Sequence, residues 1–168
     1  GFRRGEVVIL PAMSKSSLYR ALPADRRVSL VLHAITNHKG ARALYATRLV
    51  AKGGGFRAVK LMTWPADKLA REIVRLNAET PQDELELLQL LYVDVEPAIQ
   101  ITFLDAAGVA HDKGVIPEDL ELPYASAEAV QKGAAAVRAA HGESGEHYLK
   151  VIGRYNSAAW PGLAEESH

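Results

Sequence analysis

The segment HGESGEH, at positions 141–147, places two histidines and two glutamates within seven residues. The side chains in it that could ligate zinc, iron or manganese are those of His141, Glu143, Glu146 and His147. In a helical HExxH motif the two histidines are four residues apart and share one face, whereas here they are six apart with two glycines between them. A metal site therefore requires a tight turn that brings all four side chains together.

The same segment fits a junction between two helices. A cation is favoured at the C-terminal end of a helix, where His141 would lie, and anions are favoured at the N-terminal end of the next, near Glu143 and Glu146. Gly142 can end the first helix and Ser144 can cap the second. We favour this interpretation over a metal site because it needs no convergence of distant atoms.

A second candidate for chemistry is the basic, glycine-rich segment 52–60, KGGGFRAVK. Backbone N–H groups in glycine-rich turns can bind anions, and Lys52, Arg57 and Lys60, together with Arg48, supply positive charge. Neither the P-loop pattern nor GxGxxG before a helix is present. The segment therefore supports two hypotheses: a plain turn, or a site for a small anionic ligand such as a phosphorylated metabolite.

Nucleic acid is a further alternative for the same basic region. Phe56 and Trp64 lie among basic residues, and aromatic rings between cations are typical of surfaces that bind single strands. Trp64 directly precedes a proline that can start a helix, where a large apolar side chain commonly packs on its own helix. We therefore rank nucleic acid below an anionic small molecule.

Charge is distributed unevenly along a chain whose formal net charge is zero. Segment 26–75 contains eleven Lys or Arg residues against two acidic ones, and segment 76–125 contains one Lys against eleven acidic residues. Opposite charges in one molecule can pair within the chain or between two copies. This pattern favours self-association or internal pairing over binding to nucleic acid.

Helix signals are clearest where proline and capping residues precede apolar positions at helical spacing. The segments LPADRR and WPADKL each predict a helix start, and Asn37 and Gly40 predict the end of the first helix. Thr80 is expected to cap a leucine-rich helix over residues 81–95, with Pro81 in its first turn. Ser126 is expected to cap a helix that runs to the HGESGEH segment.

Four segments rich in β-branched, aromatic or alternating residues predict strands. They pair as two hairpins, 43–51 with 56–64 around the glycines, and 98–104 with 109–116 around a DAAG turn. The predicted fold class is α+β: two antiparallel β-hairpins joined in one sheet and packed with amphipathic helices, in the order α-ββ-αα-ββ-αα.

Other titratable residues do not form an obvious cluster. His111 and Asp112 are adjacent, and neighbours on a strand point to opposite faces, so a solvated turn is favoured over an acid–base pair that includes the nearby Asp105. His33 and His38 are about 140° apart on an ideal helix. They are not expected to share a ligand.

Length and composition bound the domain organisation. The chain has 168 residues, no cysteine and no apolar run long enough to span a membrane, which favours a soluble cytoplasmic protein without membrane contact. Residues 13–168 are expected to form a single α+β domain. Residues 1–12 are interpreted as an N-terminal extension or, through EVVIL, an edge strand.

These observations favour a small non-catalytic binding or adaptor domain that self-associates as a homodimer, with helix 81–95 as the expected contact surface. A protein partner is a further option, and the sequence does not identify it. No catalytic residue is assigned and no cofactor is expected, because the motifs of hydrolases, kinases, zinc proteases and EF-hands are missing. The alternatives are an anionic-ligand-binding or enzymatic domain that uses basic segment 26–75, and a nucleic-acid-binding module.

Overall fold

The computed structural model describes residues 16–163, and within them the chain is helical, with no β-strand. The elements in chain order are α2 (Ala24–Asn37), α3 (Ala41–Ala51), α4 (Ala58–Leu61), α5 (Ala66–Arg75), α6 (Pro81–Leu90), the π-helical segment η1 (Leu91–Val95), α7 (Pro97–Ala107) and α8 (Ala127–Tyr155). The α+β prediction is therefore wrong, and the described fold is all-α. The predicted extension or edge strand at 1–12 lies outside the described residues.

The first predicted hairpin is instead a pair of helices, α3 and the short α4. Helix α3 buries Tyr45, Ala46 and Leu49, which is helical spacing, while Leu44 and Val50 are partly exposed. The apolar residues alternate in the sequence, but their burial does not alternate with a period of two. The three glycines connect two helices, and two of them use positive φ angles to do so.

The second predicted hairpin is a helix followed by a loop. Segment 98–104 lies in α7, whose buried residues Ile99, Phe103 and Leu104 again follow helical spacing. Pro97 occupies the first turn of α7, where its missing N–H leaves no hydrogen bond unmade. Segment 109–116 forms only an isolated antiparallel bridge, between Asp112 and Val115.

Two of the predicted capping residues, Thr80 and Ser126, are confirmed. Thr80 Oγ1 accepts a hydrogen bond from the N–H of Asp83 at 3.1 Å, and Asp83 Oδ2 accepts one from the N–H of Thr80 at 2.9 Å. This reciprocal capping box starts α6 with Pro81 in its first turn. Ser126 caps α8 through the N–H of Ala129 at 3.1 Å.

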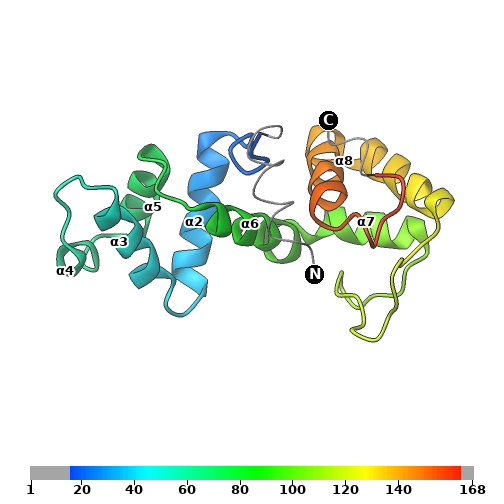
Figure 1. The fold of residues 1–168 in the computed structure, drawn as a ribbon, viewed down its shortest axis with the longest axis horizontal. Helices are drawn as coiled ribbons and strands as arrows, with labels where there is room; N and C mark the ends of the chain where they lie inside the picture. Colours follow the sequence, from blue (N-terminus) through cyan, green and yellow to red (C-terminus); the bar gives the residue numbers. More distant parts are fainter. Residues whose placement is uncertain (1–15, 164–168) are drawn as a thin grey trace, which may run out of the picture.

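The molecule is elongated, with α3, α4 and α5 toward one end and α7 and α8 toward the other (Figure 1). Helix α2 packs on α5, and α7 packs on α8. Segment α6–η1 crosses the middle, and the chain bends by 78° between it and α7. No helix among the described residues has by itself the length and apolarity of a membrane span; α6–η1 and α7 meet those criteria only when they are joined across the bend.

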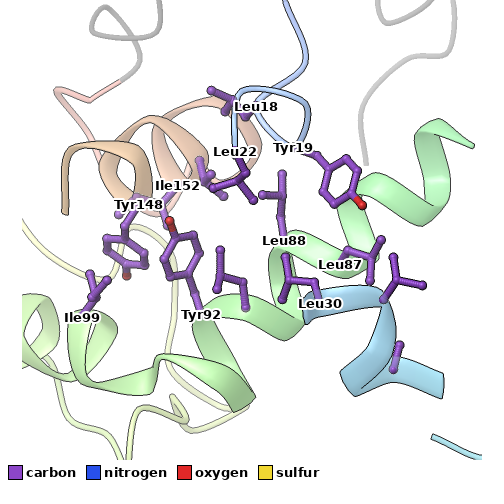
Figure 2. Close-up of a cluster of buried hydrophobic side chains, with 14 of the residues drawn as sticks. Leu18, Tyr19, Leu22, Leu30, Leu87, Leu88, Tyr92, Ile99, Tyr148 and Ile152 are labelled. Atoms are coloured by element: carbon purple, nitrogen blue, oxygen red, sulfur yellow. The ribbon is translucent and has the colours of Figure 1, made fainter. Parts of the chain in front are cut away.

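The two halves of the molecule pack together in an apolar centre. This centre surrounds a turn at residues 18–22, which we call the N-terminal turn. Figure 2 shows Leu18, Tyr19 and Leu22 of this turn gathered with Leu88 of α6 and Ile152 of α8. All five are buried. The turn thus fills the space between the two halves of the chain.

The leucine-rich helix over residues 81–95, expected either at the centre of the domain or at a subunit interface, contributes to this centre. Leu87, Leu88 and Leu91 are almost completely buried within one chain, and Leu90 is partly buried against the same core. Val93 and Val95 are the partly exposed apolar residues at the end of this segment. Its buried leucines therefore stabilise the monomer and are not free to bind a second copy.

Candidate functional sites

The HGESGEH segment forms a sharp break inside α8. Gly142 has φ 54° and ψ −128°, which interrupts the helical geometry. Beyond the break, Gly145 packs so closely on the first part of α8 that a Cβ atom there would lie 2.6 Å from the backbone oxygen of Val137. The segment is therefore a tight helix–helix corner that depends on glycine.

The two histidines of this corner point to different partners. His141 Nε2 lies 3.0 Å from Thr102 Oγ1 of α7. His147 Nε2 lies 2.8 Å from the carbonyl oxygen of Leu18, and its Nδ1 lies 2.5 Å from the hydroxyl of Tyr92. Because a carbonyl only accepts, Nε2 of His147 carries the proton and Nδ1 accepts from Tyr92.

The environment of His147 favours its neutral form. Burial lowers the pKa of His147, and nearby Arg26 lowers it further, while the bond to the Leu18 carbonyl acts in the opposite direction. Both ring nitrogens have partners. His147 therefore connects α8 to the N-terminal turn and to η1.

The glutamates of the segment do not complete a metal site. Glu146 accepts a hydrogen bond from Arg138 Nε at 2.7 Å, which lowers the pKa of its carboxyl group, and Glu143 is exposed. Across residues 16–163, His141, Glu143, Glu146 and His147 are not brought together as a group of metal ligands.

Of the four predicted anion-binding residues, Arg48 is already engaged. Its Nε and Nη2 atoms donate to the two carboxylate oxygens of Asp83 at 2.6 and 2.9 Å, which joins α3 to the capped start of α6. Burial alone would raise the pKa of Asp83, but the hydrogen bonds from Arg48 and Thr80 outweigh it and lower the pKa. Arg48 is therefore a structural cation.

Lys52, Arg57 and Lys60 lie instead around the start and end of the glycine linker. All three are exposed and, within the described part of the chain, make no ion pair. Arg57 and Lys60 line a shallow hollow of about 330 Å³. The exposed apolar residues Val59, at 82% exposure, and Met62 lie on the same short α4 and its end. We call these five residues the basic end.

The aromatic residues of this region are not free platforms for bases. Phe56 and Trp64 pack edge to face with ring centroids 5.9 Å apart. Lys68 Nζ lies 4.2 Å from the centre of the Trp64 ring. Both rings are partly buried against the core.

A long loop between α7 and α8 carries the opposite charge. Its exposed acidic residues are Asp112, Glu118, Asp119 and Glu121, and its exposed apolar residues are Val115 and Leu122. We call these six residues the acidic loop. In Figure 1 the loop extends from the α7–α8 half of the molecule, far from α4.

His111 fastens the acidic loop to α7. Its Nε2 lies 2.6 Å from Asp105 Oδ1, and its Nδ1 accepts a hydrogen bond from the N–H of Gly114 at 2.9 Å. His111 therefore pairs with Asp105 rather than with its neighbour Asp112. With both nitrogens engaged, the ring holds the loop in place.

A histidine group that the sequence did not suggest lies near the middle of the molecule. His33, His38 and Asp94 each offer one ligand atom, and these atoms lie within 4.8 Å of one another. His38 Nε2 is 3.6 Å from Asp94 Oδ2. The expectation that the two histidines would not share a ligand assumed one continuous helix, but α2 ends at Asn37 and His38 has an extended backbone.

A groove of about 500 Å³ adjoins this group, between the end of α2, the start of α3 and α6. Its floor is apolar, with Leu44, Leu87 and Leu90, and His38 and Glu86 are among its polar residues. The groove is open to solvent on the side of His38, which is exposed. It offers space for a small molecule or for water beside the histidine group.

Several side chains that could take part in chemistry are engaged with structural partners. His111 and His147 have both ring nitrogens occupied, and Arg48 is bound to a buried carboxylate. Within residues 16–163, the exposed charged groups that make no ion pair include the cations of the basic end and the carboxylates of the acidic loop. The chain matches no protein-family model, no curated protein and no solved structure.

Proposed function

We propose that this chain is a non-catalytic binding module that self-associates as a homodimer through its two charged ends. One observation carries the proposal: the basic end and the acidic loop lie in opposite halves of an elongated molecule, and each combines uncompensated charge with exposed apolar side chains. The two surfaces are complementary in charge, and burying the apolar side chains of one against those of the other would stabilise a complex. A cytoplasmic location, favoured by the lack of cysteine, belongs to the same proposal.

The geometry suggests an antiparallel pair. When two elongated copies lie side by side in opposite directions, the basic end of each faces the acidic loop of the other. A two-fold axis then makes the two contacts identical and closes the assembly. Complementary charge accelerates and orients the encounter, while burial of Val59 and Met62 against Val115 and Leu122 supplies apolar contact.

The mass of the full chain in solution tests this proposal. At micromolar concentration and low salt, light scattering should give twice the chain mass of 18.2 kDa, and added salt should shift the equilibrium toward the monomer. A mass of 18.2 kDa under these conditions would contradict the dimer.

Charge reversal tests the proposed contact itself. The double variants Arg57→Glu/Lys60→Glu and Glu118→Lys/Asp119→Lys should each be monomeric, because like charges then face each other in both contacts. A mixture of the two should restore a dimer, since both contacts in a heterodimer again join opposite charges. Lys150→Glu, an exposed reversal on α8, is the matched control and should leave the dimer intact. Dimers that persist in both double variants would place the interface elsewhere.

A second candidate is binding of a small anion at the basic end. The hollow beside Arg57 and Lys60 favours it, because two cations without ion-pair partners in the described chain face one small space. Pyrophosphate titrated into the chain should bind, and Arg57→Ala/Lys60→Ala should weaken its binding strongly. Lys132→Ala, an exposed change on α8, should not. Equal binding by all three proteins would exclude this site.

A further inference from the structure

We propose that His33, His38 and Asp94 form a binding site for a divalent transition metal, with zinc as the reference ion. The three residues bring two imidazole nitrogens and one carboxylate oxygen within 4.8 Å of one another. This donor set is typical of zinc sites that retain an open position. The site is independent of the proposed dimer, because none of its residues belongs to the basic end or the acidic loop.

The distances are compatible with metal binding after a small adjustment. Ligand atoms about 2.1 Å from a tetrahedral zinc ion lie about 3.4 Å from one another. The 3.6 Å separation between His38 Nε2 and Asp94 Oδ2 is already close to this value. The remaining contraction involves the exposed side chains of His38 and Asp94 and the half-buried ring of His33, none of which belongs to the buried core.

The ends of two helical elements place the three ligands. His33 lies in the last turns of α2, and His38 follows the end of that helix with φ −117° and ψ 124°. An extended residue at this point leaves the helical path, so its ring approaches that of His33, with centroids 6.2 Å apart. The Asn37 side chain is hydrogen-bonded to the backbone oxygen of His33 at 3.0 Å and contacts its Nδ1 at 3.3 Å.

Asp94 comes from a different element, the π-helical segment η1. Short π-helical stretches are rare and are frequent at functional sites, where the wider turn changes the direction of a side chain. Here η1 directs Asp94 toward His38, while Leu91 and Tyr92 of the same segment remain buried. An element of unusual geometry thus presents the only carboxylate of the group.

The groove gives a fourth ligand access to this site. His38 lines both the metal group and the groove of about 500 Å³. A metal held by three protein ligands would complete its coordination with water or with a donor atom of a molecule in the groove. Stability does not account for the arrangement, because the side chains of His38 and Asp94 are 49% and 44% exposed and such pairs contribute little.

Calorimetric titration of the tag-free full chain with ZnCl₂ tests the proposal. The wild-type chain should bind zinc, and His38→Ala and Asp94→Asn should each weaken this binding by at least about tenfold, a loss as large as that caused by removing a supporting residue around a metal. Co²⁺ offers a second reading, since its visible absorption should appear on binding and be lost in the same variants.

The control is His141→Ala, which removes a partly buried histidine from the other histidine-rich segment. It should bind zinc as the wild type does. Thermal melting without metal should show that all three variants are folded. The proposal is overturned if the wild type binds no zinc, if His38→Ala and Asp94→Asn bind as tightly as the wild type, or if His141→Ala is the variant that loses binding.

Discussion

Two helix ends in this molecule each hold a pair of histidines, and they use them in opposite ways. At the corner of α8, His141 and His147 diverge to separate partners on other elements. At the end of α2, His33 and His38 converge with Asp94. The segment with more ligand-type residues, HGESGEH, is therefore the structural one, and the pair with no acidic residue between its histidines forms the candidate site.

The difference arises from how each helix ends and what lies across from it. At the α8 corner, Gly145 packs on the backbone of Val137 and the histidines reach outward, to Thr102 and to the N-terminal turn. At the end of α2, the chain leaves the helix between the two histidines, and η1 faces them with a carboxylate. Whether two histidines converge on one point therefore depends more on where the helix ends than on how close they are in the sequence.

The largest effect should come from filling the space at the α8 corner. Gly145→Ala places a Cβ atom 2.6 Å from the oxygen of Val137, which is backbone and cannot rotate away. We expect a loss of about 3 kcal/mol in the free energy of unfolding, measured by urea denaturation. The matched change near α2 is Gly40→Ala, where φ is 85° and no atom lies within 4 Å of the added Cβ.

Gly40→Ala should cost only about 1 kcal/mol, from the left-handed backbone alone. Equal losses for the two variants would mean that the two parts of α8 separate easily at the corner. The comparison between a tight corner and an open one would then fail.

Removing one histidine from each pair should show which pair contributes to folding stability and which does not. His147→Ala leaves the Tyr92 hydroxyl and the Leu18 carbonyl without their partner, and we expect a loss of about 2 kcal/mol. His38→Ala, in metal-free buffer, should change stability by less than about 0.5 kcal/mol. Denaturation of both variants in chelator measures this, and a larger loss in His38→Ala would reverse the assignment.

His147 should contribute to the loss of folding stability at acidic pH. Its folded pKa is lowered, so its contribution is complete above the ordinary histidine pKa of about 6.5 and is lost as pH falls through the folded value. The melting temperature of the wild type should therefore fall as the pH is lowered below about 6.5. His147→Gln should show a shallower fall and His141→Gln the wild-type fall; identical profiles for all three would remove His147 as the cause.

A modest effect, smaller than that of His147→Ala, is expected where His141 contacts α7. Thr102→Val keeps the shape of the side chain but removes the hydroxyl that lies 3.0 Å from His141 Nε2. Because the contact is partly exposed, we expect a loss of about 0.5–1 kcal/mol in urea denaturation. A loss as large as that of His147→Ala would show that both histidines of the corner contribute equally.

The sequence predicted helix starts well because capping is local chemistry. Thr80, Pro81 and Asp83 are neighbours in the chain, and the capping box they form needs nothing from the rest of the fold. The predicted β-strands were wrong because they were inferred from the content of β-branched and aromatic residues, whereas the burial of these residues follows helical spacing. Pro97 starts α7, and Phe103, which was assigned to a strand, is buried on a helical face.

The candidate site could be predicted only in part. Asn37 and Gly40 did indicate where α2 ends, and that end separates the two histidines. No local signal places Asp94 beside them, because its position depends on a π-helical turn some 55 residues later and on the packing of the core around it. Likewise, nothing near Arg48 reveals that it will pair with Asp83, a contact between residues 35 positions apart.

The bond between His147 and the Leu18 carbonyl has a consequence for the order in which the protein can mature. Its two partners are 129 positions apart, and Arg154 bonds the carbonyl of Ser16 across 138 positions. A ribosome delivers the N-terminal turn first among the described segments and the residues that hold it almost last. Helices α2 and α5 can pair while synthesis continues, but the turn between the two halves must wait until α8 has emerged.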